Sequence, residues 1–186
     1  MPDVSTLAGK FLLALPGMSD PRFDHAVIVM VAHDTEGAMG IGVGRELPGL
    51  HLHELLNDLE IDPGRAPDCP ILDGGPVEPQ RGFVLHSADW QGPGTAVVDN
   101  LCALSASVEV LRAIAAGQGP SRYLIALGYA GWGGGQLEGE LSHHGWQVLD
   151  GAPSILYETP TDDRWAASWR SAGVDPGSLM GQTGRA

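Results

Sequence analysis

Hydrophobic residues along the chain fall into short runs rich in Val, Ile and Leu, separated by segments that contain glycine or proline. Runs of this length and composition are typical of strands buried on both faces. Between them lie segments in which apolar residues recur with the period of a helix. This alternation predicts helices layered on a sheet. We expect strands at residues 11–15, 26–32, 40–43, 70–72, 83–86, 96–98, 123–127 and 155–157.

Three segments carry a helical stripe with a clear start and stop. The first has leucine at positions 52, 55, 56 and 59 and ends before Pro63, which places an apolar stripe on one face. The other two begin at a polar cap and end at a glycine. They run from Ser105 or Ser107 to Gly117, and from Thr161 or Asp162 to Gly173 with Trp165 and Trp169 one turn apart.

A glycine-rich segment follows the run 123–127. Residues 128–141 read Gly-Tyr-Ala-Gly-Trp-Gly-Gly-Gly-Gln-Leu-Glu-Gly-Glu-Leu. We expect a buried strand up to Leu127, a sharp glycine-built loop directly after it, and a short helix that opens near Gln136.

Length and composition indicate one globular domain over residues 1–186. A chain of 186 residues with 43% hydrophobic residues is long enough to bury a core. The segment 62–70 carries three prolines and one glycine, and it is the place where two lobes of this domain would divide.

The net charge argues against binding to nucleic acid. Lys and Arg number 10 and Asp and Glu number 23, so the formal charge is −13. Such a surface repels phosphate backbones, and the basic residues form no cluster that would reverse this locally. We therefore do not expect direct nucleic-acid binding.

The cysteines and the apolar runs place the protein in the cytoplasm. Cys69 and Cys102 lie outside any CxxC spacing, so we expect two free thiols and no zinc site. The run 11–15 is interrupted by Pro16, and we interpret it as a strand and not as a signal peptide. No apolar stretch approaches the roughly 18 residues of a membrane span.

The common fingerprints of catalysis and cofactor binding are missing from the sequence. Neither GxGxxG nor GxxxxGK[ST] occurs, and GxSxG and HExxH are missing as well. The sequence thus predicts no cofactor and no catalytic set. The seven histidines include no pair with the i, i+4 spacing of a helical metal site, so we expect no metal.

Glu138 and Glu140 are the residues of this sequence that most resemble a pair of catalytic carboxylates. In a helix each residue turns by about 100°, so side chains two apart point away from each other. Gln136 and Glu140, four apart, share a face instead. Glu138 falls in the first turn, where a carboxylate complements the helix dipole.

Two glycine clusters are candidates for close contact with a ligand. Residues 133–135 precede the expected helix, where free backbone N–H groups can hold an anion, although Glu138 would compete for that place. The run Asp73-Gly74-Gly75-Pro76-Val77 follows a strand and has the composition of a tight turn. We favour tight packing of the chain around Trp132 as the role of the first cluster, and turn geometry alone explains the second.

Several of these motifs together resemble the YqgE/AlgH family over nearly the whole chain. The segments that carry the resemblance are Leu-Ala-Leu-Pro-Gly-Met-Ser-Asp-Pro-Arg-Phe at 13–23, His33 with Gly-Ala-Met-Gly at 37–40, Gly-Gly-Pro-Val at 74–77, Gly-Phe-Val-Leu-His at 82–86, Gly-Tyr-Ala-Gly-Trp at 128–132, Gly-Gln-Leu-Glu at 135–138 and Trp146.

The resemblance implies an α+β fold in a bacterial cytoplasmic protein. The expected architecture is a mixed, partly split β-sheet that curls into a pseudo-barrel and is covered by three to four helices. The family pattern implies no known reaction. The chain departs from it at Gly44-Arg45-Glu46, where only the arginine of the usual Asn-Arg-Pro is kept, at His144, and at Gly184-Arg185-Ala186.

From these observations we expect a non-enzymatic protein that binds a protein partner or a small ligand through its glycine-rich loops, with Arg45 as the available cation. Two alternatives stay open: indirect regulation of transcription, and a hydrolase or transferase that uses His33 or His86 with Glu138 or Asp73. The candidate binding residues are Arg45, Gly74, Gly75, Trp132, Gly135, Gln136 and Glu138.

Overall fold

The computed structural model describes residues 6–18, 20–143 and 145–178. Two of the positions at which the chain departs from the family pattern, His144 and the segment 184–186, lie outside these residues. None of the helices in the described part of the chain is long and apolar enough to cross a membrane.

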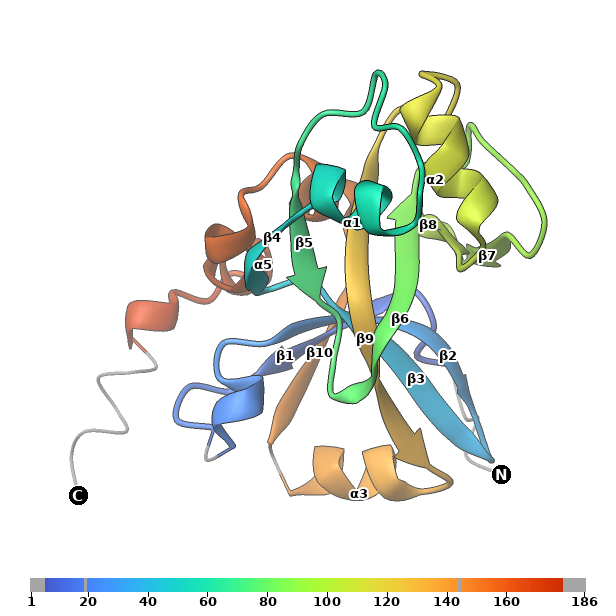
Figure 1. Cartoon of the computed structure of the whole chain (residues 1–186). Helices are drawn as coiled ribbons and strands as arrows, with labels where there is room; N and C mark the ends of the chain where they lie inside the picture. The colour runs from blue at the N-terminus through green and yellow to red at the C-terminus, as the bar shows by residue number, and fades with distance from the viewer. Residues whose placement is uncertain (1–5, 19, 144, 179–186) are drawn as a thin grey trace.

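The lower half of the molecule is an antiparallel sheet (Figure 1). Its strands lie in the order β10, β1, β2, β3 and β9, and each neighbouring pair is antiparallel. The bounds are β1 (Lys10–Ala14), β2 (Val27–Asp34), β3 (Gly37–Gly42) and β10 (Trp146–Asp150). The strand β10 was not predicted, because only one of its side chains is fully buried and the apolar pattern is weak.

The upper half is a second, mixed sheet built around the same long strand (Figure 1). The strand β5 runs parallel to β9, whereas β6 and its neighbours are antiparallel. The bounds are β4 (Glu46–His51), β5 (Pro70–Asp73), β6 (Val77–His86), β7 (Ala96–Val98) and β8 (Cys102–Ser105). Two of these, β4 and β8, were not predicted; β4 has no fully buried side chain.

The strand β9 (Tyr123–Gly133) passes through both sheets and joins them. The predicted loop directly after Leu127 is wrong, because the chain stays extended through Gly133. Gly128 has a φ of 80° and a Cβ there would lie 2.3 Å from the Gly75 carbonyl oxygen. Glycine at this position therefore lets the strand kink and pass close to the β5–β6 connection, which splits the sheet in two.

Helices cover the faces of both sheets (Figure 1). The helix α4 replaces a predicted strand at 155–157, because Pro153 occupies its first turn, where a missing N–H has no cost. The three helices expected from apolar stripes and the one near Gln136 are confirmed. The bounds are α1 (Leu52–Asp58), α2 (Val108–Ala115), α3 (Gln136–Ser142), α4 (Pro153–Tyr157) and α5 (Arg164–Ser171), with 3₁₀ turns η1 (Pro21–Phe23) and η2 (Thr161–Asp163).

The predicted α+β fold with a mixed, partly split sheet is confirmed, with more helices than the three to four expected. Three clusters of buried apolar side chains fill the space between the sheets and their helices. The segment 62–70 connects α1 to β5 within the upper half (Figure 1). Both cysteines are free thiols, and burial raises the pKa of Cys102 to about 12.

Candidate functional site

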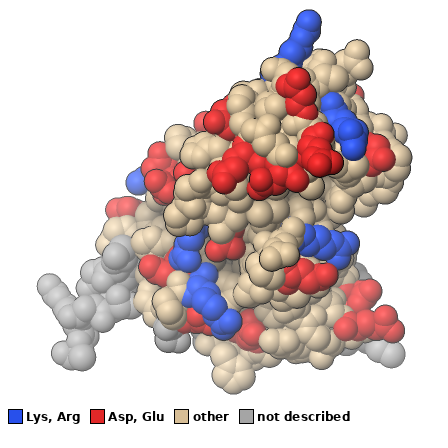
Figure 2. All heavy atoms as spheres, in the orientation of Figure 1, with Lys and Arg blue, Asp and Glu red and all other residues tan. Residues whose placement is uncertain are grey.

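Two adjoining cavities lie where the lower sheet meets the β5–β6 connection. The smaller has a volume of about 130 Å³ and the larger of about 420 Å³. Arg22, Phe23, Pro76 and Ala130 border both, so the two cavities adjoin along these residues, and together we call them the cleft. Figure 2 shows acidic atoms in a broad band over the upper half; below this band basic atoms lie on both sides of the view, with acidic atoms among them.

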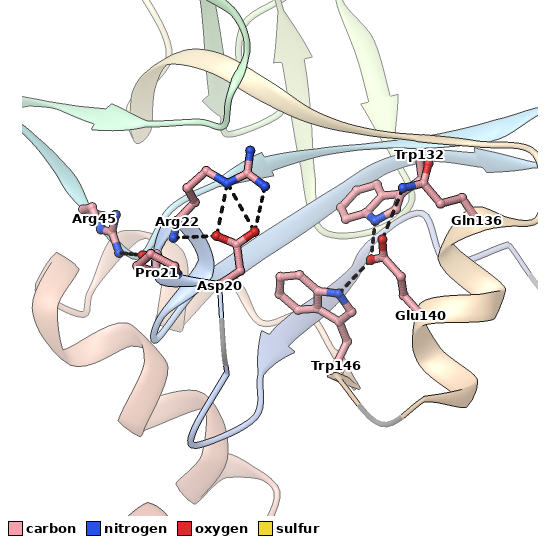
Figure 3. A network of polar contacts seen from close by, with 8 residues as sticks. All are labelled: Asp20, Pro21, Arg22, Arg45, Trp132, Gln136, Glu140 and Trp146. Carbon is pink, nitrogen blue, oxygen red and sulfur yellow. Dashed lines mark hydrogen bonds and ion pairs between the residues drawn. The ribbon is translucent and has the colours of Figure 1, made fainter.

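Arg22 stands at the boundary between the two cavities. Asp20 caps η1 by accepting a hydrogen bond from the Arg22 backbone N–H at 3.0 Å. The same carboxylate accepts from the guanidinium, with Nη2 to Oδ2 at 2.7 Å and Nε to Oδ1 at 3.1 Å (Figure 3). This side-chain contact holds the pKa of Asp20 below its usual range. The guanidinium also lies over the Phe23 ring, 5.6 Å from its centroid.

Arg45 follows β3 and borders the smaller cavity. Its Nη2 donates to the Pro21 carbonyl oxygen at 3.3 Å (Figure 3). It also donates to the Asp24 carbonyl oxygen at 3.3 Å. Arg45 thus fixes the η1 segment, and its Nε and Nη1 have no hydrogen-bond partner among the described residues.

Gly74 and Gly75 border the same cavity, but their backbone N–H groups are already engaged. The Gly74 N–H donates to the Leu127 carbonyl at 2.8 Å, and the Gly75 N–H donates to Asp73 Oδ1 at 3.2 Å. A Cβ at Gly74 would lie 2.2 Å from the Gly128 carbonyl oxygen. These glycines therefore permit close packing against β9 and shape the cavity wall.

Glu140 organises the far end of the larger cavity. Its Oε2 accepts from the indole N–H of Trp132 at 2.9 Å and from that of Trp146 at 3.0 Å. Its Oε1 accepts from Gln136 Nε2 at 3.2 Å, as expected for side chains one turn apart on α3. In Figure 3 both indoles point their N–H edges at this carboxylate, across the cleft from Asp20 and Arg22.

The orientation of the Gln136 amide follows from its two partners. The Gly133 backbone N–H donates to Gln136 Oε1 at 3.0 Å, so the oxygen faces the backbone and the nitrogen faces Glu140. The three aromatic rings are held edge to face, with Phe23 and Trp146 at 5.4 Å and Trp132 and Trp146 at 6.4 Å between ring centroids. The larger cavity is therefore rigid and aromatic on one side.

Glu138 points away from the cleft and meets His33. The distance from His33 Nε2 to Glu138 Oε1 is 2.6 Å. His33 Nδ1 accepts from the Leu7 backbone N–H at 3.2 Å, so the proton of the neutral ring is on Nε2, which donates to Glu138. This contact lowers the pKa of Glu138. Neither residue borders the cleft, and the side chain of His33 is 3% exposed.

The lowered pKa of Glu138 predicts a contribution to stability that depends on pH. A carboxylate whose pKa in the folded protein lies below its ordinary value of 4.5 contributes its full stabilisation above that value. This contribution is lost as pH falls through the folded pKa. We expect Glu138→Gln to lower the free energy of unfolding by less than about 1 kcal/mol at pH 7, because the side chain is half exposed. The difference from wild type should vanish as pH falls below the folded pKa in urea unfolding.

Glu109→Gln is the matched control, since Glu109 lies in the first turn of α2 and makes no hydrogen bond or ion pair among the described residues. A Glu138→Gln difference that stays constant from pH 7 to pH 3 would contradict the assignment.

His86 belongs to a chain of hydrogen bonds in which His86 and Ser105 are fully buried and the other members are half-buried. Its Nδ1 donates to the Ser87 carbonyl and its Nε2 accepts from Ser105 Oγ, both at 2.8 Å. Thr95 Oγ1 accepts from the Gly92 N–H and donates to Ser105 Oγ. Every member has a partner and Ser105 is 0% exposed, so this chain joins β6 and β8 to the 92–95 turn.

The structure divides the candidate residues among three places. Arg45, Gly74 and Gly75 border the smaller cavity, and Trp132 and Gln136 border the larger one. Gly135, with a φ of 78°, caps α3, and Glu138 pairs with His33 outside the cleft. The cleft residues that were not predicted include three charged ones, Asp20, Arg22 and Glu140. The Asp-Pro start of η1 and the i, i+4 spacing of Gln136 and Glu140 are the sequence signals for them.

Comparison with known proteins identifies relatives over the whole chain. The AlgH-like family model matches residues 11–177. A UPF0301 protein of Novosphingobium aromaticivorans is 62% identical over 186 residues, which cover 100% of both chains. A UPF0301 protein of Rhizorhabdus wittichii is 53% identical over 182 residues, 98% of both chains.

Two solved structures share the fold. The solution structure of the AlgH protein from Pseudomonas aeruginosa has a TM-score of 0.81 at 41% identity, over 100% of this chain and 99% of that one. A crystal structure of a Corynebacterium diphtheriae protein has a TM-score of 0.70 at 20% identity, over 92% and 88% of the chains, which shows the fold alone. With a family model matched from the first strand to beyond α5, the chain belongs to the AlgH-like family.

Proposed function

We propose that the protein binds a small organic anion in the cleft and performs no chemistry on it. The observation that carries this proposal is the placement of two arginines from separate segments, Arg22 and Arg45, on the wall of one cavity. Guanidinium groups match carboxylate and phosphate groups in both charge and shape. This is the ligand-binding form of the hypothesis from sequence, with Arg22 added to Arg45.

Of the acids beside the two arginines, Asp20 and Asp73 are engaged in hydrogen bonds, and Asp24 lies 4.0 Å from His25 Nε2. Asp20 is paired with one edge of Arg22, and the other terminal nitrogen, Nη1, has no hydrogen-bond partner among the described residues. Asp73 Oδ1 accepts the Gly75 N–H. The charge of −13 over the whole chain repels long polyanions, whereas a small anion in the cleft meets the two arginines at short range. Direct binding of nucleic acid is therefore disfavoured in this proposal.

The positions of the two histidine-containing pairs also support a binding function. The pairs that resemble parts of a catalytic site, His33 with Glu138 and His86 with Ser105, border neither cavity. Each of these side chains is engaged in structural hydrogen bonds. We place this function in the cytoplasm, as the composition indicates.

Ribose 5-phosphate and inorganic phosphate are suitable first probes for isothermal titration calorimetry. We expect saturable binding of ribose 5-phosphate that Arg22→Ala weakens by about 10-fold or more, because a hydrogen bond to a charged group contributes about 1.5–3 kcal/mol. Arg112→Ala is the control, since Arg112 is exposed on α2 and outside the cleft. Equal binding by Arg22→Ala and wild type would contradict the proposal, and binding of a protein partner through the same loops would then be the remaining form of the hypothesis.

A further inference from the structure

We propose that the anion is a nucleoside monophosphate or a close analogue, with its base in the larger cavity and its phosphate at Arg22. This inference rests on the proposed function and names the class of ligand. It combines three features of the cleft: a rigid aromatic wall, a fixed pair of hydrogen-bonding groups at the far end, and a guanidinium at the near end.

The walls of the larger cavity suit a flat, apolar ring. Phe23, Trp132, Trp146 and Pro76 border it, and its volume of about 420 Å³ falls in the range of small-molecule sites. The aromatic side chains are held in place, since both indole N–H groups are bonded to Glu140. Because these side chains are already ordered, the binding of a ring in this cavity costs little free energy for fixing them.

The far end presents a hydrogen-bond acceptor beside a donor. Glu140 Oε1 accepts one hydrogen bond from the described residues, that of Gln136 Nε2, and an ionised carboxylate oxygen can accept another. Gln136 Nε2 has a second N–H, and the Gly133 contact fixes the direction of the amide. The two atoms are 3.2 Å apart. This pair is complementary to the edge of a nucleobase, on which a ring nitrogen or carbonyl lies next to an N–H group.

The near end supplies the charge. Arg22 borders both cavities, whereas Gln136 and Glu140 border only the larger one. A ligand that spans the larger cavity from Glu140 therefore ends beside the guanidinium of Arg22, on the side where Arg45 also lies. A base joined through a sugar to a phosphate has its polar edge and its charge at opposite ends, as this cleft requires.

Calorimetric titration with three probes separates this inference from the proposed function. The probes are AMP, which has base and phosphate, ribose 5-phosphate, which lacks the base, and adenosine, which lacks the phosphate. We expect AMP to bind at least about 10-fold more tightly than either fragment, since contact of a base with an aromatic wall contributes about 1–3 kcal/mol.

Gln136→Ala tests the far end. We expect this substitution to weaken the binding of AMP by about 3- to 10-fold and to leave the affinity for ribose 5-phosphate unchanged, because only the base reaches the amide. Gln118→Ala, at an exposed position outside the cleft, is the control. Gln136 is exposed on α3, and an unchanged unfolding midpoint shows that the variant is folded.

The outcomes are distinguishable. AMP as the tightest probe, with the selective effect of Gln136→Ala, supports both proposals. AMP and ribose 5-phosphate of equal affinity, both weakened by Arg22→Ala, would overturn the nucleotide inference and leave the organic-anion function standing. Adenosine as tight as AMP, with no effect of Arg22→Ala, would overturn the anion function, and no binding of any probe would overturn both.

Discussion

Replacing Glu140 with alanine is expected to lower the free energy of unfolding by about 2–6 kcal/mol. The carboxylate accepts both indole N–H groups of the larger cavity, and Trp132 and Trp146 are 8% and 7% exposed. Its removal leaves two buried donors without a partner, each at a cost of about 1–3 kcal/mol. Urea unfolding followed by circular dichroism measures the change.

Glu138→Ala is the matched comparison, since it removes the same side chain two residues earlier on α3. It breaks one contact, to His33, and its carboxylate is half exposed, so we expect a loss below that of Glu140→Ala. Equal losses for the two variants, or less than about 0.5 kcal/mol for Glu140→Ala, would contradict the role assigned to Glu140.

Arg164→Ala is expected to destabilise the protein by about 3–4 kcal/mol. Arg164 is 5% exposed, and burial lowers its pKa. Its Nη1 donates to the Val43 carbonyl at 2.7 Å, and its Nε donates to the Ile155 carbonyl at 3.3 Å. The side chain thus ties α5 and α4 to the end of β3, and alanine leaves these carbonyls unpaired beside a cavity.

Arg170→Ala is the control for this change, because Arg170 is exposed in the last turn of the same helix. We expect it to change the free energy of unfolding by no more than about 0.5 kcal/mol. Arg164→Lys keeps the charge but loses the forked donors of the guanidinium. Its loss of free energy of unfolding should lie between those of Arg164→Ala and Arg170→Ala. A loss for Arg164→Ala as small as that of Arg170→Ala would show that the buried guanidinium is not needed.

The sequence predicted most of the buried elements, but it missed β8, in which three of four residues are buried. The apolar stripe of α1 and the caps of α2 and α5 identified helices that the structure contains, and runs such as 11–15 and 26–32 correspond to central strands. The missed strands β4 and β10 are largely exposed, with few buried side chains to set a pattern. Their position depends on pairing with strands distant in sequence, which a local pattern does not report.

In β9 the local composition predicted a loop where the structure has a strand. Glycines at 128, 131 and 133 resemble a loop, but Ala130 and Trp132 alternate with them and are buried in the strand. Gly128 is needed because the Gly75 backbone comes so close, a contact between residues 53 positions apart (128 − 75). Local composition therefore indicated a turn where tertiary packing maintains an extended chain.

The candidate site was predicted in part. Arg45, Gly74, Gly75, Trp132 and Gln136 were named from sequence and all border the cleft. Their association with Arg22 could not be predicted, because it depends on where η1 packs against β3. The contact between His33 and Glu138 was one of several open combinations, and it depends on the packing of α3 against β3 and β9, beside the end of β2.

The most direct test of the binding account is a ¹H–¹⁵N NMR titration of the indole N–H groups with AMP. Trp132 and Trp146 donate to Glu140 at the cleft, whereas Trp165 donates to the Ala14 carbonyl outside the residues that border it. We expect the Trp132 and Trp146 signals to shift in a saturable manner and the Trp165 signal to stay in place. Unmoved Trp132 and Trp146 signals at saturating AMP, or equal shifts of all three, would contradict a ligand site in this cleft.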